Sequence, residues 1–230
     1  MPPPLRGGCP CQKFRERLMI DPRANANGNL NEKRIDLMLI ASLVEQGTRV
    51  LDIGCGNGEL MELLVDERNV DARGLELSQQ GVNACVSRGL AVVQGNADTD
   101  LSYYPDQGFD TVILSQTLQA TRRPKEVLQE MSRIGSKLIV SIPNFGHWRI
   151  RLALALRGRM PETQALSATW YETANIHLCS MLDLTDLCDE LSLRVETCLT
   201  VTNGKVLHST GRPSALQNLM AELVVFELTR

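Results

Sequence analysis

A turn in which glycine recurs at every second position holds the residues best suited to chemistry. It reads Asp52-Ile53-Gly54-Cys55-Gly56-Asn57-Gly58 and lies between a short apolar run and a helical pattern. Glycines at such a turn let the backbone bend sharply and let a ligand approach it closely. The dinucleotide fingerprint needs a further glycine at Glu59, and a phosphate-binding loop needs a following Lys-Ser/Thr pair; this sequence has neither. The turn therefore predicts a ligand site that is not built for a dinucleotide or a nucleoside triphosphate.

Two acidic residues narrow the class of ligand. Glu76 ends the next apolar run, twenty residues beyond Gly56, where an acid can hydrogen-bond both ribose hydroxyls. Asp52 is expected to face the same crevice, where a carboxylate suits a cation, such as an ammonium beside a sulfonium, and repels a diphosphate. Asn96 and Asp98 follow the third expected strand and are placed to flank an adenine edge. The alternative is that the acids only cap helices and the glycines only form turns; the spacing of Glu76 favours a nucleoside ligand.

The elements that must position these residues follow from short apolar runs that alternate with helical patterns. Strands are expected over residues 50–53, 72–77, 91–93, 111–114 and 137–140. Helices are expected over residues 33–45, 59–67, 78–88 and 124–134. Ser78 is a natural N-cap, and Pro124 suits a first helical turn, where a missing N–H costs nothing. Continuous apolar strands separated by helices predict an α/β fold with a doubly wound, mostly parallel sheet.

The pattern becomes less regular toward the C-terminus. An insertion is expected at about residues 145–180, with a helix over residues 148–157. A helix over residues 183–190 follows it, carrying apolar residues on one face. Residues 193–199 and 223–228 are expected to be the last two strands, as an antiparallel pair at the sheet edge.

The N-terminal segment differs in composition from the rest of the chain. Residues 1–30 are rich in proline, glycine and asparagine and lack a periodic apolar face. A segment with so little apolar surface to bury is expected to be disordered or loosely docked. We therefore predict an N-terminal extension over residues 1–30 and one α/β domain over residues 31–230.

The composition excludes several function classes. The 230 residues carry 24 Lys+Arg against 27 Asp+Glu, a net charge of −3, and only 4% are aromatic, which disfavours a nucleic-acid partner. No apolar run is long enough for a membrane helix, so no membrane partner is expected. The 7 cysteines are odd in number and scattered, which predicts reduced thiols in a cytoplasmic protein. Cys9 and Cys11 have no second ligand pair at zinc-like spacing, so no metal is expected.

These features together resemble the class I S-adenosylmethionine-dependent methyltransferases. The resemblance covers about residues 34–142, including the glycine turn, Gly74-Leu75-Glu76-Leu77 and Gly95-Asn96-Ala97. It implies a Rossmann-like sheet, mostly parallel with an antiparallel edge strand, and S-adenosylmethionine or S-adenosylhomocysteine as ligand. Such proteins commonly have Gly-Asp-Ala at residues 95–97, so here either Asn96 or Asp98 is left to pair with the adenine amino group. The implied cofactor-binding residues are Asp52, Gly54, Cys55, Gly56, Asn57, Gly58, Glu76, Leu77, Asn96, Ala97, Asp98, Ser115 and Gln116.

Four later phrases resemble one family more closely, the bacterial methionine biosynthesis proteins MetW. They lie at residues 112–120, 143–149, 158–161 and 170–179. The resemblance covers nearly the whole chain after about Arg34. It implies an accessory or regulatory protein of methionine biosynthesis that acts with a homoserine O-acyltransferase of the MetX type.

The sequence offers one candidate for a catalytic residue, His147. His147 could act as a general base, because an imidazole titrates near neutrality, or could instead pack and orient the loop before Trp148. His177 lies between two apolar residues and is expected to be buried. Two functions stay open: a ligand-binding accessory protein of homoserine acylation, and an active S-adenosylmethionine-dependent methyltransferase with an unidentified small-molecule acceptor.

A group of arginines stands out in an acidic chain. Arg149, Arg151, Arg157 and Arg159 lie within eleven residues. On a helix Arg149 and Arg151 diverge by about 200°, at about 100° per residue, so the four cannot form one stripe. They are either part of a solvated surface or a docking face for an acidic partner, with Arg149, Arg157 and Arg159 as the candidate contact surface.

Overall fold

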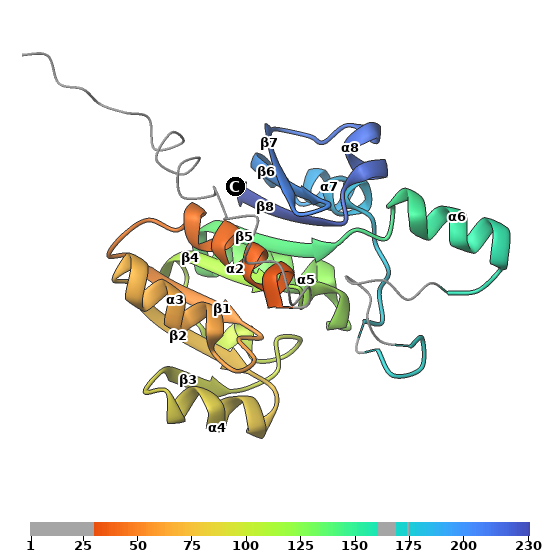
Figure 1. Ribbon diagram of the computed structural model, residues 1–230. Helices are drawn as coiled ribbons and strands as arrows, with labels where there is room; N and C mark the ends of the chain where they lie inside the picture. The colour runs from red at the N-terminus through yellow and green to blue at the C-terminus, as the bar shows by residue number, and fades with distance from the viewer. Residues whose placement is uncertain (1–29, 161–168, 174) are drawn as a thin grey trace, which may run out of the picture. The chain divides into compact units, whose positions relative to one another are not determined.

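An eight-stranded sheet is the central element of the structure, a computed structural model that describes residues 30–160, 169–173 and 175–230 (Figure 1). The strand order is β3-β2-β1-β4-β5-β8-β6-β7. The strands are β1 (Arg49–Ile53), β2 (Asp71–Glu76), β3 (Ala91–Gln94), β4 (Phe109–Ser115), β5 (Gly135–Pro143), β6 (Arg194–Thr202), β7 (Lys205–Thr210) and β8 (Leu223–Thr229). β1 to β5 are parallel, whereas β8 runs antiparallel to β5 and β6, and β7 runs antiparallel to β6.

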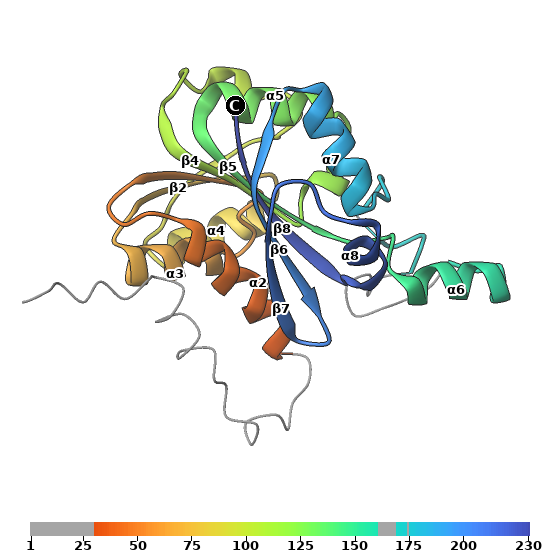
Figure 2. The same ribbon diagram turned by 90° about the horizontal axis from the view of Figure 1, so that it is seen from above.

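Helices cover both faces of this sheet. They are α2 (Leu30–Leu43), α3 (Glu59–Arg68), α4 (Gln79–Ser87), α5 (Pro124–Ile134), α6 (Trp148–Arg157), α7 (Met181–Glu190) and α8 (Ala215–Met220), with short turns η1 (Leu101–Tyr103) and η2 (Leu118–Ala120). α5 and α7 lie on one face, and α3 and α4 on the other (Figure 2). Right-handed crossovers between parallel strands require this arrangement, because the strand order reverses between β3 and β4. The predicted doubly wound α/β fold is confirmed.

The chain divides into two compact units, residues 1–34 and residues 35–230. Nearly all of the residues that the structure describes belong to the second unit. The predicted extension over residues 1–30 lies outside the described residues except for Leu30. The helix expected over residues 33–45 spans Leu30–Leu43. None of the described helices is long and apolar enough to cross a membrane.

The core explains why the central strands are apolar throughout. β1, β4 and β5 have helices on both faces, so residues that point either way are buried. Val50 and Leu51 of β1 and Ile113 and Leu114 of β4 are all fully buried. One core cluster then continues under α5 and α7 to β6 and β8. The strand ends that carry the glycine turn are thus set on a rigid base.

The C-terminal part contains two elements that the sequence analysis did not predict. β6 and β8 do form the expected antiparallel pair, but β8 lies inside the sheet and β7 is the edge strand. β7 was missed because its side chains are mostly exposed and show no apolar run. The sequence cue for a hairpin here was the pair Asn203-Gly204, which is common in tight hairpin turns. In the structure both residues have positive φ angles, 48° and 71°, as such a turn requires. α8 was missed although Ser214 and Gln217 form a capping box at its start.

Candidate ligand-binding site

The glycine turn joins β1 to α3 at the carboxyl end of the sheet, as predicted. All three glycines have positive φ angles, 73° at Gly54, 55° at Gly56 and 80° at Gly58. A side chain at Gly54 would lie 2.7 Å from Cγ2 of Thr117, and one at Gly58 would lie 2.5 Å from Cδ1 of Leu90. Gly54 and Gly58 are therefore explained by close packing within the protein.

Gly56 has a different environment. A Cβ atom built on it would meet nothing within 4 Å. Its backbone N–H donates to Oε2 of Glu76 at 2.9 Å, which orients the turn toward the end of β2. Open space beside a left-handed glycine, next to an acidic side chain, leaves room for a ligand to approach the backbone.

The carboxylate of Glu76 links two turns. Oε2 accepts the N–H of Gly56, and Oε1 accepts the N–H of Ser78 at 2.8 Å, just before α4 begins. Gly81 makes this approach possible, because a side chain there would lie 2.7 Å from Cγ of Glu76 and from the carbonyl oxygen of Gly56. Gly81 was not predicted from the sequence as part of the site; a glycine in the first turn of a helix was the feature that could have identified it. Each carboxylate oxygen keeps a lone pair for a further donor, such as a ribose hydroxyl.

Asp52 is an acid buried in the core beneath the glycine turn. Its side chain is only 2% exposed, and Oδ1 has no hydrogen-bond partner among the described residues. Burial raises the pKa of the Asp52 carboxyl to about 7, and the negative charge of Glu76 adds to the rise. A buried carboxyl with an oxygen left unpaired by the described residues is stabilised by a cation or a donor that enters the crevice.

Asn96, Ala97 and Asp98 follow β3 and form the neighbouring turn. Oδ1 of Asn96 accepts the N–H of Asp98 at 2.9 Å. The Asp98 carboxylate accepts the N–H groups of Arg122 and Arg123 and so holds the segment that leads into α5. Asp98 therefore has a structural role of the capping kind that the sequence analysis kept open.

Ser115 and Gln116 continue the site at the end of β4. Oγ of Ser115 lies 3.2 Å from Oγ of Ser141 on β5, and the N–H of Gln116 donates to the carbonyl oxygen of Ser141 at 3.0 Å. The Gln116 amide donates to Oδ2 of Asp36, a buried acid on α2. Asp36 was not predicted from the sequence, although it lies on the same helical face as the buried Leu39 and Ile40, and a charged residue on such a face usually has a partner.

The remaining predicted residues of the turns differ in exposure. Cys55 is buried, and its Sγ lies 3.8 Å from Sγ of Cys85. Burial raises the pKa of the Cys55 thiol above its usual range, so it fills space as an uncharged group. Leu77, directly after Glu76, is 66% exposed, and Asn57 is exposed as well. An exposed leucine beside the acid offers an apolar contact to a base.

The two candidate histidines, His147 and His177, have different environments. His147 is buried at the start of α6, where its carbonyl oxygen accepts the N–H groups of Ile150 and Arg151. Burial lowers the pKa of His147 against an opposing effect of Glu222, so the ring is neutral at neutral pH. Within the described part of the chain, no hydrogen bond or ion pair joins His147 to Asp52 or Glu76. The expectation that His177 is buried is wrong, because its side chain is exposed; its backbone N–H donates to the carbonyl oxygen of Gln119 in η2.

The four arginines of residues 149–159 do not share one environment. Arg149 and Arg157 line one face of α6, with the Arg149 guanidinium 5.4 Å from the centre of the Trp148 ring. Arg159 follows the C-cap Gly158 and is exposed. Arg151 points elsewhere and donates to the carbonyl oxygen of Gly146, which agrees with the predicted divergence of Arg149 and Arg151. In the part of the chain that the structure describes, no group of acids, cysteines and histidines has the arrangement of a metal site.

Comparison with known proteins decides the family. The sequence pattern of the family described as methionine biosynthesis protein MetW matches residues 34–228. The chain belongs to the MetW family. Its relative in Rhodopirellula baltica is a bifunctional methionine biosynthesis protein MetXA/MetW, 30% identical over 207 residues, which make up 85% of this chain and 33% of that protein. A second relative, a fatty-acid O-methyltransferase of Mycolicibacterium smegmatis, is 36% identical over 94 residues, 39% of this chain and 34% of that protein. This MetW chain thus spans about a third of the length of these two relatives.

Solved structures confirm the fold. A methyltransferase from Archaeoglobus fulgidus that depends on S-adenosylmethionine superposes with a TM-score of 0.63 at 16% identity, covering 86% of this MetW chain and 93% of that one. Another from Thermotoga maritima gives 0.61 at 19% identity, covering 86% and 89%. The MetW chain therefore has the class I methyltransferase fold, as the sequence analysis predicted.

One MetW phrase has a structural explanation. Asn144, in the phrase at residues 143–149, is fully hydrogen-bonded in the core: its amide donates to the carbonyl oxygens of Asn218 at 2.6 Å and Ala221 at 2.8 Å. Its Oδ1 accepts the N–H groups of Gly146 at 3.0 Å and Met181 at 3.1 Å. Asn144 therefore ties the end of β5 to the start of α7 and the end of α8.

Proposed function

We propose that the chain is an accessory protein of methionine biosynthesis that binds S-adenosylmethionine or S-adenosylhomocysteine and acts with a homoserine O-acyltransferase. The observation that supports the ligand is the open space beside Gly56, whose N–H donates to Glu76, together with the buried Asp52, whose Oδ1 has no hydrogen-bond partner among the described residues. Both acids disfavour a phosphate chain and favour a nucleoside that carries positive charge. The thiols of the described cysteines are all free, in keeping with a cytoplasmic location.

Each group of the ligand has a counterpart in the site. Glu76 would accept both ribose hydroxyls, and Asp52 would face the ammonium and the sulfonium. Leu77 would cover one side of the adenine, with Asn96, Ala97 and Asp98 along its edge. The backbone from Gly54 to Gly58, including Cys55 and Asn57, would cradle the amino-acid part, and Ser115 and Gln116 would close its far side. When bound, S-adenosylmethionine supplies an electrophilic methyl group.

The case for the partner rests on the relative from Rhodopirellula baltica, whose name joins MetXA and MetW in one polypeptide. Fusion of two modules holds them at high effective concentration, which is useful when they work on each other. Since S-adenosylmethionine is made from methionine, its binding here would carry feedback to the acylation step. Such feedback requires that the ligand bind the free and complexed forms with different affinity; a coupling of about 1–3 kcal/mol is sufficient.

The deciding experiment measures homoserine O-acyltransferase activity with and without this protein, and with and without S-adenosylmethionine. We expect the protein to change the rate and the nucleoside to modify that change. Glu76→Ala should remove the nucleoside effect while the protein still affects the enzyme. An acyltransferase whose rate is the same under all four conditions would contradict the proposed function.

A second candidate function is methyl transfer to a small-molecule acceptor. It is favoured by the likeness of 94 residues to the fatty-acid O-methyltransferase. Methyl transfer depends chiefly on in-line positioning and does not need a strong base, so it does not require His147 to be bonded to Asp52 or Glu76. Turnover of S-adenosylmethionine above about 1 s⁻¹ with any small acceptor would support this function over the accessory role.

A further inference from the structure

Helix α6 is the least buried helix of the C-terminal part. Figures 1 and 2 show it extending away from the sheet. Of its ten residues only Ile150 is buried. A helix of this length is marginal in water unless its apolar face packs against something.

The base of α6 is nevertheless held firmly. Asn144 anchors the preceding turn to α7 and α8, and Nε of Arg151 donates to the carbonyl oxygen of Gly146 at 2.6 Å. A side chain at Gly146 would lie 2.6 Å from Oδ1 of Asn218, so the turn packs tightly against α8. The direction of α6 is therefore fixed by its first turn, while further along the helix Leu152 and Leu156 are exposed and Ala153 and Leu154 are half-buried.

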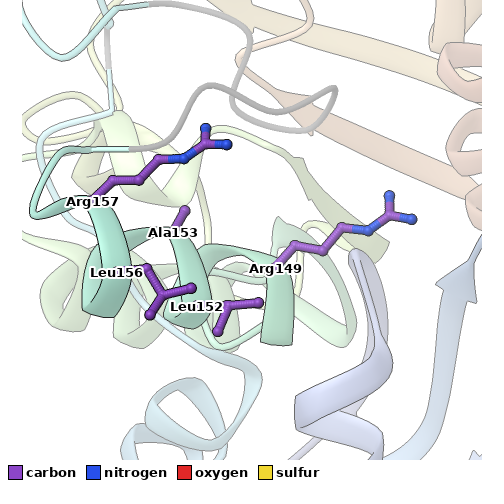
Figure 3. A pocket seen from close by; sticks show the side chains of 5 residues that line it. All are labelled: Arg149, Leu152, Ala153, Leu156 and Arg157. Carbon is purple, nitrogen blue, oxygen red and sulfur yellow. The ribbon is translucent and has the colours of Figure 1, made fainter.

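The uncovered side has the pattern of a docking face. Its residues follow the spacing i, i+3, i+4, i+7 and i+8, which places them on one side of a helix. They line a shallow pocket of about 230 Å³ and are Arg149, Leu152, Ala153, Leu156 and Arg157 (Figure 3). Leu152 is 47% exposed and Leu156 is 76% exposed. Figure 3 shows the guanidinium groups of Arg149 and Arg157 extending in the same direction, one from each end of the face.

We propose that this face of α6 docks into an apolar groove with carboxylates at its two ends, on the homoserine O-acyltransferase; the proposal rests on the accessory function described above. Leu152 and Leu156 would enter the groove as anchors, in the manner of an amphipathic helix bound by its partner. Arg149 and Arg157 would pair with the carboxylates and set the register of the helix.

Charge argues against a second copy of this chain as the partner. A two-fold interface brings the same face of both copies together. If two α6 helices paired antiparallel about Ala153, Arg149 of one copy would lie opposite Arg157 of the other at each end. Like charges in such positions repel, whereas an acidic partner satisfies both arginines.

A lipid surface is the other occupant that a basic amphipathic helix suggests. The apolar part of this face consists of Leu152, Ala153 and Leu156, only two of which are large. Stable interfacial binding draws on a larger buried apolar face. The relative that joins MetXA and MetW in one polypeptide instead favours a protein as the partner.

The test measures the Kd between this full-length protein and purified homoserine O-acyltransferase from the same organism. We expect the double variant Arg149→Glu/Arg157→Glu and the single variant Leu156→Asp each to weaken the complex at least tenfold. Matched controls are Arg194→Glu on β6 and Leu216→Asp on α8, both exposed and outside the face; they should change Kd less than twofold. Circular dichroism and S-adenosylmethionine binding should be the same in all five proteins.

The outcomes separate the two proposals. If the wild-type protein binds the acyltransferase and all variants bind equally well, the α6 proposal is overturned and the accessory function stands. If the wild-type protein does not bind the enzyme, the partner itself is wrong and the α6 proposal falls with it. Binding of phosphatidylglycerol vesicles, or self-association in sedimentation, that is lost in the face variants but kept in the controls would assign the face to those occupants and overturn the proposal.

Discussion

Replacement of Asp52 by asparagine is expected to change the pH dependence of stability. The carboxyl of Asp52 has an ordinary pKa of 3.8, which burial raises to about 7 in the folded chain. The unfolded chain therefore loses this proton near pH 4, whereas the folded chain keeps it until about pH 7. Because the folded state binds more protons in that window, its stability falls as the pH rises and the loss is complete above about pH 7.

The size of the effect follows from the shift. A rise of about three pKa units, at about 1.4 kcal/mol per unit, sets an upper limit near 4 kcal/mol. Asparagine has nearly the same shape and carries no charge, so Asp52→Asn should be free of this penalty. We expect the variant to be more stable than the wild type by roughly 1–4 kcal/mol at pH 8, with the difference shrinking toward zero at pH 4.

Urea unfolding followed by circular dichroism at pH 4, 6 and 8 measures this difference directly. Asp66→Asn on α3, an exposed residue, is the matched control and should show no such trend. A constant difference between Asp52→Asn and the wild type across the three pH values would refute the reasoning, since it would mean that Asp52 ionises at the same pH in both states.

Three further predictions concern the ligand and the N-terminus. The positive charge of bound S-adenosylmethionine should lower the pKa of Asp52 from about 7, so binding at pH 7 should release about half a proton per ligand. Calorimetry in two buffers of different ionisation enthalpy measures this release. The Asp52→Asn variant should release no proton on binding. Glu76→Ala removes two proposed hydrogen bonds to the ribose and should weaken binding by more than roughly 10- to 150-fold, which is the effect of losing one charge-assisted bond of about 1.5–3 kcal/mol. Glu67→Ala, at an exposed residue, should not weaken binding. Unchanged affinity in a folded Glu76→Ala protein would sink the assignment. A chain that begins at Asn29 should have the same melting temperature as the full-length protein. A melting temperature lower by about ten degrees or more would show that the removed segment docks on the domain.

The sequence was most informative where local chemistry and spacing coincide. The glycine turn, Glu76 and Ser78 lie where the alternation of apolar runs and helical patterns places them, because buried parallel strands need continuous apolar residues. The helix over residues 148–157 was also predicted to the residue, since Gly158 ends it in a left-handed conformation.

The parts that could not be predicted depend on contacts between distant segments. The bond between Gln116 and Asp36 joins residues eighty positions apart, and Asp98 holds a backbone segment 24 residues away. Neither contact produces a periodic pattern in the sequence from which it could be predicted. The edge strand β7 could not be predicted for another reason. Both of its faces are partly exposed to water, so its sequence lacks the alternation of apolar and polar residues that identifies a strand.

The internal position of β8 has a consequence for how the molecule folds during synthesis. β8 pairs with β5 on one side and β6 on the other, and its Thr229 lies opposite Lys137, 92 residues earlier. Until β8 leaves the ribosome, β5 and β6 each present an open edge, the kind of surface that pairs wrongly with other chains. Closing so long a loop is also slow. Nascent chains halted before Leu223 should therefore depend on chaperones, whereas chains that have released β8 should not.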